Sequence, residues 1–467
     1  MHTLIRGLVG LLLLAAGCAT RGASADPVDA YLQAVREKNH IPGVAVAIVR
    51  DGKVEKASAQ GLADLESEAK AATDTAFQLA SVTKVFTGTL VMLLVQEGKL
   101  ELDAPVSKYL TDAPEAWKAI TVRHLAAHAS GLANSPDDET SAGATVAERY
   151  AAALQQPLAY PPGERSEYGL TDFVVLTHVL EKATGQDFEA LLRGRIFEPL
   201  GFTCTRYDHA VWQGQDLIAD VVPRRATIYG FAKGVYRKAW FPYPAHTYAA
   251  GGVFSCVDDL VRWAVALDAG TLLSAESQRT AATAFKLTGG REGGYGVAFV
   301  PGRLRGLSTF GHAGGGSLAD VLRVPDQKLT VIVLSNAQGL LPVLAPNIAS
   351  LYLPPLPGVD APGLEDSEPA LTTRLRGVVE GLMNGSLDAE AFAPLAQQQL
   401  LPILRSLGTP GSALFPPLRR MTLVEDGMDG ETRKRGYRVV YGQDTAVKWT
   451  FRLDAEGRVL DVQYDWE

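Results

Sequence analysis

Apolar residues follow two different spacings along this chain, which predicts a mixed α and β protein. Runs with apolar residues three or four positions apart predict amphipathic helices, and short apolar runs between turn residues predict strands. A hairpin is expected where Asp51 and Gly52 separate two such runs. The predicted helices cover 27–39, 81–97, 121–127, 145–155, 171–183, 188–197, 255–267, 371–383 and 388–404. The predicted strands cover 43–50, 53–60, 295–300, 307–311, 318–324, 329–335, 421–425, 435–441, 445–453 and 458–464.

The order of these elements predicts an α+β fold. Predicted strands lie at 43–60 and again at 295–335, and the segment between them is mainly helical. This order favours one antiparallel sheet packed against helices, in which the first and last strands meet although they lie far apart in sequence. Residues 203–250 are rich in Pro, Tyr and Gly, and we interpret them as long irregular loops.

A proline-rich and acidic stretch without periodicity, residues 354–368, is interpreted as a linker between two domains. A length of 467 residues also favours two folded units. We therefore divide the chain into a domain of residues 26–353 and a small α+β domain of residues 369–467, with two helices and a four-stranded antiparallel meander. The second domain contains no recognisable catalytic constellation, so we expect it to pack against or bind a partner that the sequence does not identify.

The amino terminus has the features of an export signal. Residues 1–25 begin with a short, weakly basic stretch, and the apolar core that follows at 8–16 is too short to span a bilayer. Two processing sites are open. Leu-Ala-Ala-Gly-Cys at 14–18 resembles a bacterial lipobox, which would make Cys18 the lipid-bearing first residue, whereas Ala-Ser-Ala at 23–25 suits ordinary signal cleavage. We favour the first, an exported periplasmic protein anchored to the membrane as a lipoprotein.

Composition narrows the classes of partner. The chain has 47% hydrophobic and 21% charged residues and a formal net charge of −8, without a Lys/Arg-rich tract. This balance argues against nucleic acid or an anionic membrane as the main partner. No apolar run is long enough to predict a spanning helix, so membrane attachment is expected only through lipidated Cys18. Cys204 and Cys256 could pair in an oxidising compartment, but we favour two small, buried, unpaired side chains.

Residues 81–84, Ser-Val-Thr-Lys, are the first candidates for a catalytic role, and the helix 81–97 is predicted to begin there. In the first turn of a helix, Ser81 and Lys84 would share one face, close to helix-start N–H groups that can stabilise an oxyanion. This arrangement suits a serine that must lose a proton and then hold an acyl group. The same spacing recurs at Ser67 and Lys70, in a polar stretch interpreted as a loop, so only context distinguishes the two.

Four further stretches supply that context. They are Pro-Pro-Gly-Glu-Arg-Ser-Glu-Tyr-Gly-Leu at 161–170, Gly-His-Ala-Gly-Gly-Gly at 311–316, His-Leu-Ala-Ala-His-Ala-Ser-Gly-Leu at 124–132, and Pro-Ala-His-Thr-Tyr-Ala-Ala-Gly-Gly at 244–252. Together with 81–84, they resemble the β-lactamase and D-Ala-D-Ala peptidase superfamily, in the branch of class C β-lactamases and related esterases and D-amino-acid peptidases. The resemblance covers roughly residues 27–350 and implies a β-lactamase/transpeptidase-like fold, in which an all-helical region accompanies the sheet.

The resemblance implies roles for individual residues. Ser81 would be the acylated nucleophile, Lys84 its proton-handling neighbour, and Tyr168 the tyrosine of the family's Tyr-x-Asn motif. His312 and Gly314 match the family's Lys-Thr-Gly motif in a His-x-Gly form. The oxyanion hole would then consist of the backbone N–H groups of Ser81 and Gly315.

Two residues could serve as the base for Ser81. An isolated tyrosine is only about one part in a thousand ionised at neutral pH, and the roughly 4 kcal/mol needed to ionise Tyr168 could come from a buried ammonium such as Lys84. Lys84 could equally be the base if desolvation lowers its own pKa. The sequence leaves this choice open, and the two groups can titrate as a unit.

One position departs from the family pattern. Leu170 stands where the family usually has Asn, whose side chain helps to hold the substrate amide and the catalytic lysine. Leucine can do neither, so β-lactam or D-Ala-D-Ala peptide turnover is less expected than ester cleavage. His312 adds to this expectation because an unperturbed histidine is mostly neutral at pH 7 and grips a carboxylate less firmly than a lysine does.

The sequence therefore predicts an exported serine hydrolase that acts on a small-molecule ester, a β-lactam or a D-amino-acid-containing peptide or amide through a Ser81 acyl-enzyme. No metal or organic cofactor is implied. His124 and His128 are one helical turn apart, but we interpret them as helix-end packing residues because no carboxylate motif accompanies them. The competing hypothesis is a catalytically weak or inactive penicillin-binding-like protein that binds peptidoglycan or a protein partner, motivated by Leu170 and the second domain.

Overall fold

The computed structural model describes residues 26–134, 145–213, 216–315, 318–338, 344–353, 361–406, 418–430, 432–441 and 445–466. Its α-helices are α1 Pro27–Lys38, α2 Lys84–Gln96, α3 Val122–Ala126, α4 Val146–Leu154, α5 Leu170–Thr184, α6 Phe188–Leu192, α7 Val257–Asp268, α8 Ala275–Ala282, α9 Leu344–Tyr352, α10 Pro369–Asn384 and α11 Pro394–Ser406. Its strands are β1 Gly43–Arg50, β2 Lys53–Asp64, β3 Ala69–Lys70, β4 Phe77–Gln78, β5 Val211–Gln213, β6 Asp216–Ile218, β7 Tyr229–Ala232, β8 Val235–Lys238, β9 Phe254–Ser255, β10 Val300–Leu304, β11 Leu307–Gly314, β12 Ala319–Val324, β13 Leu329–Ser335, β14 Ala337–Gln338, β15 Leu418–Asp429, β16 Thr432–Tyr441, β17 Thr445–Leu453 and β18 Val459–Trp466.

An antiparallel sheet in the order β10-β11-β12-β13-β1-β2-β3 forms the centre of the fold, as the order of elements predicts. β1 pairs with β13, so the first and last strands of the region meet: Val44 lies opposite Ser335, and Arg50 lies opposite Leu329. The side chain of Asn336 ties this junction to its neighbours, because it accepts the Gly43 N–H at 2.7 Å and donates to the Leu62 carbonyl at 3.0 Å.

The two faces of the sheet pack against different helices. Successive residues of a strand point to opposite faces, and β1 is buried on both sides. Ala45, Ala47 and Val49 belong to the large core shared with α2, α5 and α7, whereas the intervening residues of β1 pack with α1 and α9. Burial on both faces explains why 43–50 is a continuous apolar run rather than an alternating one.

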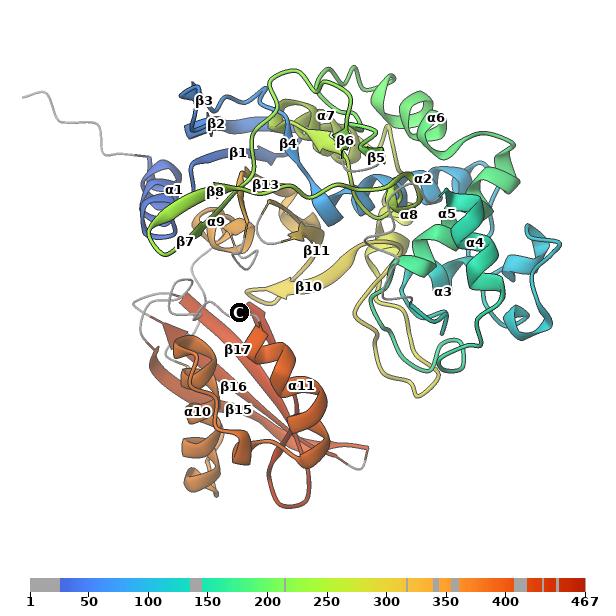
Figure 1. Cartoon of the computed structure of the whole chain (residues 1–467). Helices are drawn as coiled ribbons and strands as arrows, with labels where there is room; N and C mark the ends of the chain where they lie inside the picture. The colour runs from blue at the N-terminus through green and yellow to red at the C-terminus, as the bar shows by residue number, and fades with distance from the viewer. Residues whose placement is uncertain are drawn as a thin grey trace, which may run out of the picture.

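The C-terminal part has its own core. β15 to β18 form an antiparallel meander, and α10 and α11 lie against one face of it (Figure 1). This confirms the predicted arrangement of two helices and a four-stranded meander. β18 also joins the main sheet at one position, where Leu304 of β10 lies opposite Trp466. The domain boundaries given above stay predictions, and most of the predicted linker, 354–360, lies outside the described residues.

Three local predictions are wrong for identifiable reasons. Residues 295–299 are not a strand: they pack against α2, where Gly88 leaves room for the Val297 carbonyl, and β10 begins only at Val300. The helix predicted at 388–404 is divided, because Pro394 lacks an N–H group and α11 can begin only there. The loop prediction for 203–250 misses the hairpins β5–β6 and β7–β8; the second turns at Lys233 and Gly234, both with positive φ.

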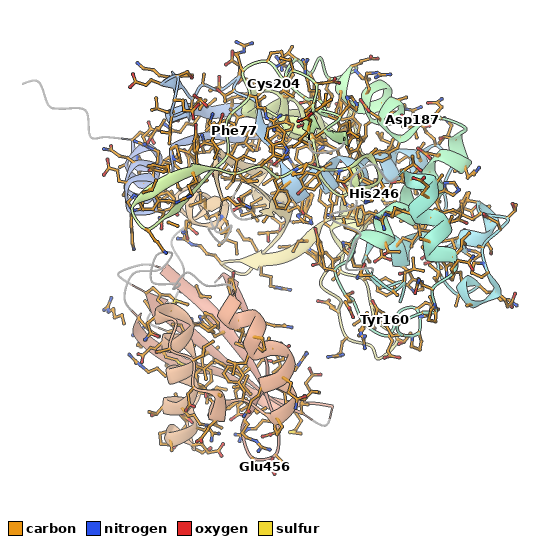
Figure 2. The ribbon with its side chains drawn as sticks, in the orientation of Figure 1. Phe77, Tyr160, Asp187, Cys204, His246 and Glu456 are labelled. Carbon is orange, nitrogen blue, oxygen red and sulfur yellow. A yellow bond between two sulfur atoms is a disulfide. The ribbon has the colours of Figure 1, made fainter. Side chains whose placement is uncertain are left out.

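Cys204 and Cys256 are joined by a disulfide, with their Cα atoms 6.0 Å apart. The expectation of two unpaired cysteines is therefore wrong, because sequence alone does not show that the segment before β5 approaches the residue between β9 and α7. Figure 2 labels Cys204 in the part of the molecule that holds α7. Within the described residues, no helix combines the length and the apolar composition needed to cross a membrane. Residues 1–25, with Cys18, lie outside the described part.

Candidate active site

Ser81 lies in a tight turn at the start of α2. Residues Ala80–Thr83 form a 3₁₀ turn, and the α-helix itself begins at Lys84, three residues later than predicted. In a 3₁₀ turn, residues three apart lie directly above one another, so Ser81 and Lys84 still share a face. The backbone N–H of Lys84 donates to the Ser81 carbonyl. Ala80 has a φ of 46°, a strained value for a residue with a Cβ, and it fixes the entry of the chain into this turn.

Tyr168 connects Ser81 with Lys84. Its phenolic oxygen lies 2.8 Å from Ser81 Oγ, and it accepts a hydrogen bond from Lys84 Nζ at 2.7 Å. Tyr168 precedes α5, and 43% of it is exposed, which is high for an aromatic residue in such contacts. Ser81 and Lys84 precede Tyr168 by 87 and 84 positions in the sequence. The structure brings the three residues together, as the sequence predicts.

The ammonium of Lys84 is buried and hydrogen-bonded to protein groups. Only 1% of the residue is exposed. Its ammonium donates to the Ala250 carbonyl at 2.8 Å and lies 4.9 Å from the centre of the Phe173 ring. The buried ammonium thus places a positive charge directly beside the Tyr168 oxygen. The Ala250 carbonyl is a ligand that sequence reasoning missed, because a backbone acceptor leaves no residue-type signal.

The ring of Tyr168 packs on a buried histidine. The His128 and Tyr168 rings are 4.6 Å apart, and His128 Nδ1 lies 3.3 Å from Asp172 Oδ2. The other oxygen of this carboxylate, Oδ1, accepts the Ser130 hydroxyl. Burial lowers the pKa of His128 and raises that of Asp172, so both changes favour an uncharged pair behind Tyr168. His124 caps the start of α3 with Thr121. The two histidines therefore lie at helix ends and pack there, as predicted. His128 in addition packs against the Tyr168 ring.

β11 supplies the opposite side of the site. Gly314 approaches residue 79 so closely that a Cβ would overlap the Leu79 carbonyl, and a Cβ on Gly315 would lie 3.9 Å from that of Ala80. Glycine at 314 is thus required for the end of β11 to reach the turn that holds Ser81. This proximity is what an oxyanion hole formed by the Ser81 and Gly315 amides requires. Gly316 lies outside the described residues.

His312 is a buried neutral group on β11. Its Nδ1–H donates to the Ala313 carbonyl at 2.7 Å, and among the described residues its buried Nε2 has no hydrogen-bond partner. Burial, assisted by the charge of Lys84, lowers the pKa of His312 to about 3. The ring therefore offers the site a hydrogen-bond acceptor at neutral pH, not a cation for a carboxylate.

This pKa predicts a pH dependence of stability. Between about pH 6.5 and 3, the unfolded chain binds a proton at residue 312 that the folded chain does not, so His312 lowers the free energy of unfolding as the pH falls. We expect wild type to lose about 1.5 kcal/mol more than His312→Gln between pH 6.5 and 5, measured by urea unfolding. Asp320, whose pKa is raised to about 7, gives stability the opposite pH dependence. Its contribution is the same in wild type and in His312→Gln. Parallel pH dependences would contradict the prediction.

Leu170 is the first residue of α5 and packs, partly buried, against the main core. It therefore offers no polar group in place of the asparagine expected by resemblance. Sequence reasoning missed a nearby amide: the side chain of Asn134 occupies the space that a Cβ on Gly169 would fill. Thr171 Oγ1 holds the same segment by donating to the Ala133 carbonyl at 3.0 Å. An amide group is thus present beside Tyr168, though from a different chain segment.

Tyr243 was also missed by sequence reasoning. Its ring covers Gly251 and Gly252, where any Cβ would overlap it, next to the Ala250 carbonyl that binds Lys84. It packs against the cluster formed by Ala80, Ile228 and Leu318, and Ala80 directly precedes Ser81. An aromatic side chain therefore lies close to the turn that holds Ser81. No motif marks it, since the contact depends on the fold of residues 229–248.

The second Ser-x-x-Lys match has no such surroundings. Ser67 lies in the turn after β2, where its hydroxyl donates to Asp64 Oδ1 at 2.8 Å, and Lys70 lies exposed in the short strand β3. The interpretation of this stretch as a loop is confirmed for Ser67, whereas Lys70 belongs to a two-residue strand. Ser67 and Lys70 form no site.

Comparison with known proteins agrees with this geometry. Residues 28–352 match the family model described as Beta-lactamase. Protein flp of Staphylococcus aureus (strain COL) is 30% identical over 191 residues, which are 39% of this chain and 38% of that protein. The chain thus matches less than half the length of this relative.

Solved structures share the fold. The octameric penicillin-binding protein homologue from Pyrococcus abyssi superposes with a TM-score of 0.60 at 21% identity, over 94% of this chain and 98% of that one. EstCE1, a hydrolase with promiscuous acyltransferase activity, gives 0.55 at 20% identity, over 70% and 97%. D-amino acid amidase from Ochrobactrum anthropi SV3 gives 0.55 at 23% identity, over 67% and 92%. At these identities the likeness shows the fold alone.

Proposed function

This chain belongs to the beta-lactamase family of serine hydrolases, and on that premise we propose that it cleaves small esters through an acyl-enzyme on Ser81. The observation that carries the proposal is the position of the Tyr168 oxygen, within hydrogen-bonding distance of both Ser81 Oγ and Lys84 Nζ. A nucleophile, a proton acceptor and a cation that stabilises the acceptor's charged form are then in direct contact.

The proposed reaction has two halves. Ser81 Oγ forms a bond to the carbonyl carbon while its proton passes to the Tyr168 oxygen, and Lys84 compensates the changing charge. The Ser81 and Gly315 amides hold the oxyanion. The tetrahedral intermediate then expels the alkoxide, which takes the proton from Tyr168. Water attacks the acyl-enzyme by the same route in reverse, and Ser81 regains its proton as the acid leaves.

Two features support esters over amides. Leu170 provides no side-chain amide for a substrate amide group, and an ester has no N–H that needs one. His312 is neutral, so it does not supply the second cation that would bind a substrate carboxylate. The D-amino acid amidase among the structural neighbours, with Asn134 beside Gly169, makes a D-amino-acid amide the second candidate.

We also propose that the protein is exported. Residues 1–25 have the composition of an export signal, ending at a lipobox-like Cys18 or at a small-residue cleavage site. The disulfide between Cys204 and Cys256 supports an oxidising compartment such as the periplasm. Labelling cells with radioactive palmitate tests lipid attachment, and Cys18→Ala should abolish the label.

The test of activity uses three substrates and one inactive variant. We expect p-nitrophenyl acetate to be hydrolysed far faster by wild type than by Ser81→Ala, with slower turnover of D-alanine p-nitroanilide and of a chromogenic β-lactam. Mass spectrometry of the quenched reaction should show an acyl group on Ser81. Equal rates for wild type and Ser81→Ala on all three, without an adduct, would favour the inactive binding protein instead.

A further inference from the structure

A cleft of about 320 Å³ lies where the C-terminal part meets the main sheet. Its walls include Tyr295 and His312 on one side, Val300 and Pro301 of β10, and Tyr464 of β18. Its volume is in the range of small-molecule sites, which often occur between domains. The sequence itself assigns no role to the second domain.

The pairing of the strands keeps this cleft open. The ladder between β10 and β11 ends where Val300 lies opposite Gly311, so the last residues of β11 extend beyond it. β18 meets β10 only at the other end, at Leu304. Figure 2 labels Glu456, in the turn between β17 and β18, at the end of the C-terminal part farthest from the main sheet. β18 therefore runs from that far end back to β10 and brings Tyr464 to the cleft.

Two residues of the cleft wall, Tyr295 and His312, also lie close to the candidate active site. The Tyr295 ring is 5.8 Å from the Tyr168 ring, whose oxygen is 2.8 Å from Ser81 Oγ. His312, on the cleft wall, belongs to the same β11 segment as Gly314, which contacts the turn before Ser81. A substrate bound at Ser81 and long enough to pass Tyr295 would thus enter the cleft and reach β18.

The lining indicates what such a substrate would carry. Tyr295, Val300, Pro301 and Tyr464 present aromatic and aliphatic surface, and 43% of Tyr464 is exposed. The charged residues of the lining are Arg303, which lies exposed on β10, and Asp320, which is buried. The ring of Tyr464 is held by Trp449, at 5.3 Å, so it offers a fixed apolar surface. His312 is neutral and places no charge at the entrance. These surfaces fit a hydrocarbon chain better than a charged group.

We propose that the C-terminal part forms one wall of the substrate site, where Tyr464 contacts the long apolar arm of an elongated ester. The inference rests on the proposed ester hydrolysis at Ser81. It gives the C-terminal part a role in selectivity: short esters contact only the catalytic residues, whereas long ones also contact β18.

Two pairs of esters test this, one for each arm of an ester. One pair differs on the acyl side, p-nitrophenyl acetate and p-nitrophenyl decanoate, and the other on the alcohol side, methyl acetate and decyl acetate. In Tyr464→Ala, we expect kcat/KM for the long member of one pair to fall about tenfold, with the short members unchanged. Arg303→Ala, an exposed residue on the β10 wall, should give a fall in the same pair.

Controls separate the two proposals. Met428→Ala changes an exposed residue of β15 outside the cleft and should leave all four rates unchanged. Activity on p-nitrophenyl acetate shows that each variant is folded. If Tyr464→Ala is inactive on p-nitrophenyl acetate, the result for Arg303→Ala alone tests the role of the C-terminal part. Unchanged long-to-short ratios in both pairs would overturn the role of the C-terminal part, whereas a wild type that hydrolyses no ester faster than Ser81→Ala does would overturn the proposed function itself.

Discussion

Replacement of Ser81 by alanine is expected to lower kcat for p-nitrophenyl acetate by about 10⁴-fold or more, because the nucleophile and the proton acceptor work as one unit. The substitution removes one hydroxyl from a partly exposed position at the start of α2, so the melting temperature should change little. Stopped-time assays give the rate, and intact-protein mass spectrometry should show that the acyl adduct is lost.

Ser67→Ala is the matched control. It removes the serine of the second Ser-x-x-Lys match, whose hydroxyl bonds only locally to Asp64 in an exposed turn. We expect wild-type kinetics and a normal adduct. A loss of activity in this variant comparable to that in Ser81→Ala would show that the loss does not report nucleophilic catalysis at Ser81.

The contrast between the two matches shows what a short motif can predict. Both have a serine and a lysine three residues apart, yet only Ser81 is followed by a buried helix and meets Tyr168. The order of several motifs along the chain favours Ser81, the serine that contacts Tyr168 in the structure. The Ser-x-x-Lys spacing alone does not distinguish the two matches, because Ser67 and Lys70 have the same spacing outside any helix.

The fold was predictable where local patterns determine it. β1 and the hairpin that follows it have a continuous apolar run and an Asp-Gly turn, and their bounds were close to those observed. The pairing of β1 with β13 followed from the order of elements. The predictions failed at 295–299 and 388–393, where packing on α2 and the position of Pro394 outweigh the apolar pattern.

The candidate site was predictable only in part, because some of its members have no sequence signal. Ser81, Lys84 and Tyr168 are marked by motifs, and the structure brings them together. The Ala250 carbonyl and the ring of Tyr243 reach the site through long-range packing, which residue types do not reveal. The disulfide and the cleft beside Tyr464 depend in the same way on contacts between distant segments.

Tyr168→Phe should be the second most severe change, with a fall in kcat/KM for p-nitrophenyl acetate of about 10²- to 10⁴-fold. Phenylalanine keeps the ring that packs on His128, so the fold should persist, but it removes the oxygen that lies between Ser81 and Lys84. Tyr150→Phe is the control: its hydroxyl bonds to Asp112 at 2.7 Å, away from the site, and activity should stay normal.

The double variant Lys84→Met with Tyr168→Phe decides whether the two residues act together. In our proposal, Lys84 acts on Ser81 through the Tyr168 oxygen. Lys84→Met and Tyr168→Phe each interrupt this same proton path. We therefore expect the double variant to be about as slow as the slower single variant, not slower by the product of the two losses. Multiplying losses would mean that Lys84 and Tyr168 serve separate steps, and would contradict the proton path through Tyr168.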